Sequence, residues 1–261
     1  MAFPKFTMKE LIEAGVHFGH HTRRWNPKMA PYVFGVKDKI HIIDLQKTVP
    51  MLHAGLSALR NAAQQGGKVL FVGTKPQARD IIKEAAEVCG QFYVNSRWLG
   101  GLLTNWKTVV NSIRKLKKTE ADIANAEGLG LTKKEVSKME LECRKLKSVL
   151  GGVMEMNGSP DVLFVLDVSK EDLAVLEANK LGIPVVGICD TNSDPSGVDY
   201  PIPGNDDAIK ALKLYADLAV KAVLDGLEEQ LKASGADLGA AINPAARTVS
   251  NENPEEKTGR K

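Results

Sequence analysis

The sequence has little of what extracellular, membrane and cysteine-based metal proteins require. Its 261 residues include three cysteines, Cys89, Cys143 and Cys189, and none belongs to a C-x-x-C pair, so we expect neither a disulfide framework nor a cysteine zinc site. No apolar run approaches the ~20 residues that cross a membrane. Residues 1–15 also lack the long apolar segment of a secretory signal. These absences predict a soluble, cytoplasmic protein.

Motifs for nucleotide-dependent catalysis are missing as well. Neither GxxxxGKS/T nor GxGxxG occurs in the chain, and no pairing of a nucleophile with a base is evident from spacing. The turn Gly73-Thr74-Lys75 follows an apolar run, where the start of the next helix could bind a phosphate. A nucleotide-binding α/β enzyme that uses this turn is therefore the alternative hypothesis. The sequence favours a non-enzymatic protein in which Thr74 caps the helix.

Charge is divided unevenly along the chain, although the net charge is only +3. Residues 1–150 carry 25 basic and 13 acidic side chains, whereas residues 151–261 carry 10 basic and 19 acidic ones. Such a division is typical of a protein in which one part faces a polyanion. The pattern predicts a polyanionic partner for the first part and a different kind of neighbour for the second.

Short apolar runs alternate with helical patterns. The runs cover residues 68–72, 161–167 and 183–188, and helical periodicity follows each of them, at residues 78–88, 169–181 and 205–223. Strands that are apolar on both faces and alternate with helices are typical of a parallel sheet covered on both sides. We predict an α/β fold with a doubly wound parallel sheet, formed by residues 1–103 and 151–228. The second helix is expected to bury Leu173, Leu176 and Leu181.

A different pattern interrupts the α/β rhythm at residues 104–150. Apolar residues recur at helical spacing on both sides of a Gly-Leu-Gly interruption, and offsets of three and four residues in the second half resemble a coiled-coil seam. This predicts an inserted antiparallel helical (coiled-coil) hairpin. Toward the C-terminus, Ala, Gly, Asn, Pro and Glu predominate, which leaves too little apolar surface to fold alone. Residues 229–261 are therefore predicted to form a disordered or partner-ordered tail.

A first cluster, residues 17–28, combines basic, aromatic and amide side chains with no acid. Arg and Lys neutralise phosphates, Trp and Arg stack on bases, and Asn and His reach base edges or 2′-hydroxyls. The candidates for RNA binding are His20, Arg23, Arg24, Trp25, Asn26 and Lys28. A solvated basic loop with Trp25 packed on the body is the other interpretation, and composition favours neither.

A second cluster, residues 95–107, places adjacent glycines beside an Arg-Trp pair, and glycines allow a partner to approach the backbone closely. Its RNA-binding candidates are Arg97, Trp98, Asn105 and Lys107. In the alternative interpretation Trp98 is part of the hydrophobic root of the hairpin. Lysines on the outward face of the hairpin add an electrostatic contact, namely Lys115, Lys117, Lys118, Lys133 and Lys134.

Aspartates gather after the third apolar run, at Asp190, Asp194, Asp206 and Asp207. Turn formation and helix starts account for these residues, so we expect no catalytic residue, no metal ligand and no cofactor. Because grouped carboxylates also suit Mg²⁺, a structural Mg²⁺ near Asp190 and Asp206 is the minority alternative.

Several long strings resemble a known family. They are AGVHFGHHTRRWNPKMAPYVFG, KIHIIDLQKT, FVGTKPQA, NSRWLGGLLTNWKT, SPDVLFVLD and LGIPVVGICDTNSDPSGVDYPIPGNDDAIK, which occur in this order. Between about Leu11 and Leu224 the sequence is similar to the bacterial small-subunit ribosomal protein "S-two" family. The tail lies outside the resemblance.

The resemblance implies a fold and a role. The implied fold is a flavodoxin-like body with a coiled-coil hairpin. The implied role is that of a non-catalytic structural constituent of the small ribosomal subunit, which binds ribosomal RNA, supports translation and helps to dock the mRNA-binding ribosomal protein "S-one". The implied partners are RNA and neighbouring ribosomal proteins, with no membrane and no small-molecule substrate. By the same resemblance, residues 23–26 and 97–101 are the expected RNA-facing positions.

Overall fold

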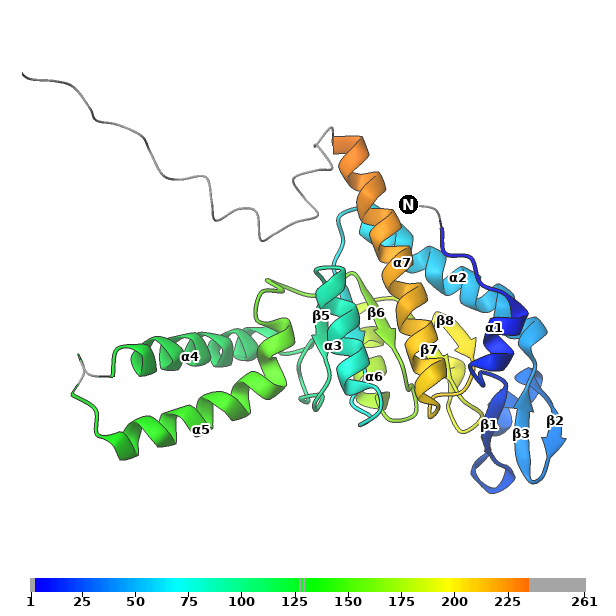
Figure 1. Ribbon diagram of the computed structural model, residues 1–261, viewed down its shortest axis with the longest axis horizontal. Coiled ribbons are helices and arrows are strands. Elements are labelled where there is room, and N and C mark those ends of the chain that lie inside the picture. Colours follow the sequence, from blue (N-terminus) through cyan, green and yellow to red (C-terminus); the bar gives the residue numbers. More distant parts are fainter. Residues whose placement is uncertain (1–2, 127, 129, 235–261) are drawn as a thin grey trace, which may run out of the picture.

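The computed structural model describes residues 3–126, 128 and 130–234 (Figure 1). Its centre is a parallel sheet with the strand order β5-β4-β6-β7-β8. The strands are β4 (Val69–Val72), β5 (Phe92–Val94), β6 (Val162–Val165), β7 (Val185–Cys189) and β8 (Tyr200–Pro203). Counted in chain order, this is the 2-1-3-4-5 arrangement of flavodoxin-like folds. The predicted α/β class and parallel sheet are confirmed.

Helices cover both faces of this sheet because successive strand residues point to opposite sides. Phe71 and Phe164 face a core shared with α1 (Met8–Glu13), α2 (Leu45–Gln64), α3 (Arg79–Val88) and α7 (Ile209–Ser234). Leu70 and Leu163 face a second core on the side of α6 (Asp172–Leu181). The central strands β4 and β6 are therefore buried on both faces, as their continuous apolar runs predict.

A second, antiparallel sheet lies beside the parallel sheet, and the sequence did not predict it. Its strands are β1 (Phe18–His21), β2 (Val33–Lys37) and β3 (Ile40–Ile43), in the order β1-β3-β2. They are short and mix apolar with basic and histidine side chains, and none of the three is buried along its whole length. Clean alternation is therefore absent, which left residues 17–28 without a predicted element.

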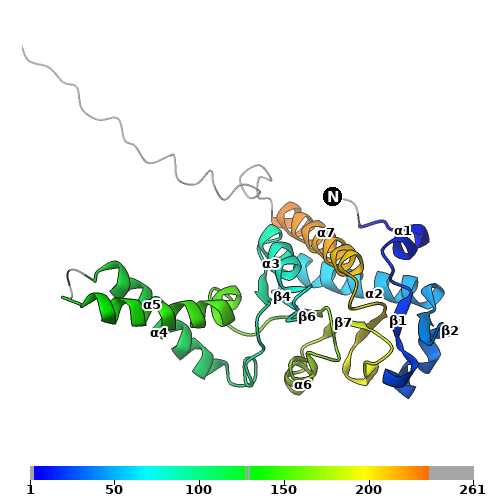
Figure 2. The same cartoon turned by 60° about the horizontal axis from the view of Figure 1, so that its bottom comes forward.

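Helices α4 (Trp106–Ala124) and α5 (Lys133–Leu150) lie side by side and extend away from the sheet (Figures 1 and 2). We call them the hairpin. Its buried side chains are Val109, Ile113, Leu116, Cys143 and Leu150. The coiled-coil geometry of the pair and the division of the chain into body and hairpin stay predictions.

Helix α7 continues to Ser234, so residues 229–234 are helical although the tail was predicted to begin there. Arg60 of α2 holds the start of this segment against the body, since its guanidinium contacts Asp225, with 2.6 Å between Nε and Oδ2, and also Glu229. The predicted tail at residues 235–261 lies outside the described residues. No helix in the described ranges combines the length and the apolarity needed to cross a bilayer.

Two local predictions were wrong. Helix α6 buries Ala174, Val175 and Ala178 and leaves its three leucines exposed, because small residues let the helix pack closely on the sheet. Thr74 does not cap α3, because that helix begins at Arg79 and has no side-chain cap. The Thr74 amide donates instead to Glu171 Oε1 at 3.0 Å.

Candidate nucleic-acid interface

The two clusters lie at the same edge of the parallel sheet. All parallel strands end at one edge, which is where doubly wound folds bind their partners. Arg97 follows the end of β5, and Thr191 follows the end of β7. The first cluster is attached there, because the Asn26 amide donates to the Thr191 carbonyl at 2.8 Å and Lys28 Nζ lies 2.6 Å from Asp194 Oδ2.

The first cluster is presented by two 3₁₀ turns, Thr22–Arg24 and Pro27–Tyr32. Arg23 and Arg24 are exposed, and neither forms an ion pair with another described residue. Trp25 is 40% exposed, and its ring centroid lies 5.6 Å from that of His41. One side of the indole thus packs on the body while the rest stays available to a partner.

Asn26 and Lys28 in the same cluster are already engaged. Asn26 Oδ1 accepts a hydrogen bond from the Lys28 amide at 3.0 Å, which caps the second turn. The ion pair between Lys28 and Asp194 lowers the pKa of that carboxyl to about 2. These two residues shape the cluster, and its remaining charge comes from Arg23 and from Arg24, which also interacts electrostatically with Asp207.

The second cluster is organised by a residue that the sequence did not single out, Glu177 of α6. Its carboxylate accepts hydrogen bonds from Trp98 Nε1 at 3.1 Å, Gly101 N at 2.8 Å, and Leu103 N, Thr104 N and Thr104 Oγ1, each at 3.0 Å. Burial raises the pKa of Glu177, but these hydrogen bonds outweigh it and the pKa is lowered.

This network places the Trp98 ring inside the body, 7% exposed. A ring buried in this way does not fit the expectation that Trp98 touches RNA. The position agrees with the alternative interpretation, in which Trp98 is part of the hydrophobic root of the hairpin. Gly101 has φ +83°, a conformation that favours glycine in the tight turn around Glu177. Arg97, Asn105 and Lys107 are exposed around this turn, and Asn105 Oδ1 accepts from Thr108 Oγ1 at 2.9 Å.

The predicted hairpin lysines are exposed on α4 and α5, namely Lys115, Lys117, Lys118, Lys133 and Lys134. Lys117 Nζ lies 2.7 Å from Glu155 Oε1, so its charge is partly balanced. Lys133 and Lys134 occupy the first turn of α5, where the helix dipole disfavours cations. Positive charges at this position do not stabilise the helix, but they favour the binding of an external anion.

The Gly73-Thr74-Lys75 turn is occupied by the protein's own carboxylates. Lys75 Nζ lies 2.9 Å from Asp167 Oδ2, 2.6 Å from Asp206 Oδ1 and 2.9 Å from Asp207 Oδ1. Burial alone would lower the pKa of Lys75, but these acids raise it. A lysine held by three carboxylates is not presented to a nucleotide phosphate, which removes the support for the alternative hypothesis.

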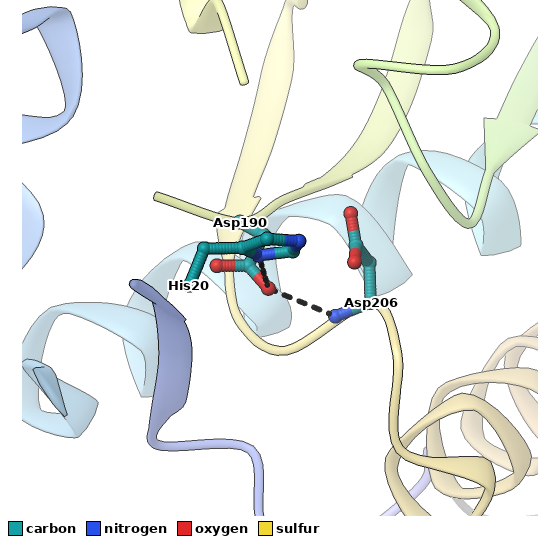
Figure 3. A group of neighbouring side chains, drawn as sticks. All are labelled: His20, Asp190 and Asp206. Carbon is teal, nitrogen blue, oxygen red and sulfur yellow. Dashed lines mark hydrogen bonds and ion pairs between the residues drawn. The ribbon is translucent and has the colours of Figure 1, made fainter. Parts of the chain in front are cut away.

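His20 belongs to the same network of acids, and little of its side chain is open to a partner. Its Nδ1 lies 2.9 Å from Asp190 Oδ2 (Figure 3). Its Nε2 lies 3.3 Å from Asp207 Oδ2, and the His20 side chain is 14% exposed. The hydrogen bond with Asp190 raises the pKa of His20. Burial, with the nearby Asp190 and Asp167, raises the pKa of Asp206 to about 8. The sequence could not foresee this placement because the acids lie far along the chain.

Comparisons with known proteins show the family of the chain. The family described as Ribosomal protein S2 matches residues 11–226. Proteins named "Small ribosomal subunit protein uS2" are similar over nearly the whole chain. The one from Gluconobacter oxydans is 59% identical, covering 95% of this chain and 94% of its own. Those from Granulibacter bethesdensis and Gluconacetobacter diazotrophicus are 56% and 61% identical, covering 99% and 92% of this chain and 100% and 92% of their own.

The fold therefore belongs to a structural protein of the ribosome. The chain is a member of the Ribosomal protein S2 family, as its sequence strings predicted. That family is structural and non-enzymatic, so the expectation that the chain is not an enzyme is confirmed.

Proposed function

We propose that the chain is a cytoplasmic constituent of the small ribosomal subunit that binds ribosomal RNA. The binding surface lies at the edge where the parallel strands end, and we call its exposed basic and aromatic side chains the basic edge. The contact residues are Arg23, Arg24 and Trp25 of the first cluster and Arg97 and Lys107 of the second. The exposed hairpin lysines add a weaker electrostatic contact. The body, residues 1–103 and 151–228, positions the clusters, and the hairpin reaches outward from it.

The observation that carries this proposal is the exposure of Arg23, Arg24 and Arg97 at one edge, without ion pairs to other described residues. An arginine that has no carboxylate partner inside the protein keeps its full capacity for a phosphate. Glu177 fixes the turn beside Arg97, and Thr191 fixes the start of the turn before Lys28. Rigid placement reduces the entropic cost of binding a folded RNA.

The test is the change of Arg23, Arg24 and Arg97 together to alanine. We expect the variant to fold normally, to enter small subunits poorly in competition with the unchanged protein, and to bind small-subunit ribosomal RNA with a shallower salt dependence. The slope of log K against log salt should fall by about 0.7 to 0.9 for each phosphate that the variant no longer neutralises.

A matched control removes three exposed lysines elsewhere, Lys9, Lys83 and Lys232, which pair with Glu13, Glu87 and Glu228. The control changes net charge equally, so its slope should stay close to that of the unchanged protein. Equal slopes and equal incorporation for the two triple variants would refute the proposed interface.

The proposal also includes docking of the mRNA-binding ribosomal protein "S-one" or of another ribosomal neighbour on the acidic half of the chain. Leu173, Leu176 and Leu181 are exposed on α6, and a partner protein docked on this helix would bury them. Leu176→Glu should reduce the amount of "S-one" that cosediments with small subunits while RNA binding persists. Unchanged cosedimentation would exclude this face as the docking surface.

A further inference from the structure

A cavity of about 490 Å³ opens where strands β4, β5 and β6 of the parallel sheet end. Strands β5 and β6 lie on opposite sides of β4, so the strand order reverses here, and doubly wound folds bind their ligands at such a switch point. Helices α3 and α6 cover opposite faces of the sheet, and both begin beside the cavity (Figure 2). Its volume lies within the range of about 300–1,000 Å³ that is typical of small-molecule sites.

Three cationic side chains line this cavity, and each follows a different strand. Arg79 comes after β4, Arg97 after β5 and Lys170 after β6. Two of them meet at one atom, because Arg79 Nε and Lys170 Nζ both donate to the Thr74 carbonyl oxygen, at 3.2 Å and 3.4 Å. Like charges held this close repel each other, and a bound anion would offset the repulsion.

The three cations keep their charge for a ligand. All three side chains are exposed, and none of them forms an ion pair with an acid in the part of the chain that the structure describes. Lys75, next to Thr74, is the opposite case, since three carboxylates hold its ammonium group. A cation without a carboxylate partner retains its full hydrogen-bonding capacity for an external anion.

Two acids also line the cavity, and both have partners within the protein. Glu171 is 3% exposed, and its Oε1 accepts hydrogen bonds from the Thr74 amide at 3.0 Å and from Thr74 Oγ1 at 2.5 Å. Burial raises the pKa of Glu171, so this carboxyl repels an anion less than an exposed carboxylate does. Asp172 Oδ1 accepts from the Leu173 amide at 2.7 Å. Three cations and two acids leave the lining positive.

We propose that this cavity binds one phosphate group, held by Arg79, Arg97 and Lys170. A guanidinium binds phosphate through two parallel hydrogen bonds, and the lysine adds a point charge. Trp98 and Leu173 also line the cavity and offer an apolar wall to a base or sugar attached to the phosphate. The phosphate group belongs to a free nucleotide or to folded RNA, and the test separates these sources. The site shares only Arg97 with the proposed RNA contacts, so it does not depend on them.

The test is titration of the full-length protein at low salt with inorganic phosphate and with adenosine 5′-monophosphate, measured by calorimetry and phosphorus NMR. We expect the two probes to compete for one site and adenosine, which lacks the phosphate, not to bind. Arg79→Gln and Lys170→Gln should each weaken binding by about 10- to 100-fold, because each removes a charge-assisted hydrogen bond.

Lys83→Gln and Lys180→Gln are the matched controls. Each removes one positive charge from α3 or α6 at an exposed position outside the cavity. Phosphate binding should be unchanged in both controls. Arg79 and Lys170 are exposed too, so their variants should unfold at the temperature of the unchanged protein.

A second measurement separates the two sources through the salt dependence of binding to small-subunit ribosomal RNA. Binding of the free probes with an unchanged RNA slope in the Arg79→Gln, Lys170→Gln double variant assigns the site to a free nucleotide. A slope lower by about 0.7 to 0.9 assigns it to an RNA phosphate, whether or not the free probes bind.

Three results would overturn the proposal. The first is no binding of either probe together with an unchanged RNA slope. The second is probe binding that the cavity variants leave unchanged or that the control variants weaken equally. The third is equal affinity for adenosine and its monophosphate. Failure of the proposed RNA interface is distinguishable, because it is measured with Arg23, Arg24 and Arg97.

Discussion

The body and the hairpin hold their basic residues in opposite ways. In the body, each cluster is fixed by contacts with distant elements, such as Glu177 with the turn at residues 98–104 and Thr191 with Asn26. In the hairpin, the lysines stand on two helices whose buried residues concentrate toward the sheet, while Ile123, Val136 and Met139 near the far end are only half-buried. The clusters of the body are therefore held in place by the fold itself, whereas the far end of the hairpin has fewer buried contacts that fix it.

The largest expected effect concerns Glu177. Changing it to alanine removes five hydrogen bonds to a buried carboxylate and leaves the Trp98 indole and several amides unpartnered. The free energy of unfolding should fall by about 3–5 kcal/mol, measured by urea denaturation, with a red shift of tryptophan emission. Glu155→Ala, which removes an exposed ion pair, should change stability by less than about 1 kcal/mol. A similar decrease for both variants would contradict the rigid-turn interpretation.

A smaller effect separates the root of the hairpin from its far end. Ile113 is 6% exposed and belongs to the core beside the sheet, so Ile113→Ala should cost about 2–4 kcal/mol. Met139 is only half-buried, and Met139→Ala should cost less than about 1 kcal/mol. Hydrogen exchange of α4 and α5 amides measures the difference. Equal costs would show that the far end is packed as firmly as the root.

The pH dependence of the body follows from the lowered pKa of Glu177. A carboxyl whose pKa is lower in the folded than in the unfolded protein stabilises the fold above its unfolded pKa of about 4.5, and this stability is lost as the pH falls through the folded pKa. Glu177→Gln should remove this part of the acid dependence. The difference in unfolding free energy between the unchanged protein and the variant should shrink as the pH drops below about 4.5. A constant difference would exclude the carboxylate's charge as the cause.

The smallest effect is expected at the start of α5. Changing Lys133 and Lys134 to glutamate should stabilise α5 by about 0.3–1 kcal/mol per residue in the protein without RNA, because acids complement the helix dipole there. The same change should weaken RNA binding. Slower hydrogen exchange together with a shallower salt slope supports an RNA role for these lysines, whereas an unchanged slope limits their role to the helix.

The sequence predicted the parts of the molecule that depend on local pattern. Strands β4, β6 and β7 were found because they are apolar on both faces, and family strings identified the chain. The antiparallel sheet was missed because its strands are short and of mixed polarity. His20 and Trp98 were assigned to RNA because their partners, Asp190 and Glu177, lie far along the chain. A local pattern identifies a candidate side chain, but its burial depends on residues that only the fold brings near.

The most direct test of the basic edge is crosslinking of the protein to RNA in cells, followed by mapping of the crosslinked peptides and nucleotides. Binding through this edge predicts crosslinks at the exposed residues of positions 23–28 and 97–107, joined to small-subunit ribosomal RNA, with weaker ones on the hairpin. Crosslinks confined to α2, α3 and α7, which cover one face of the parallel sheet, would contradict binding through the edge.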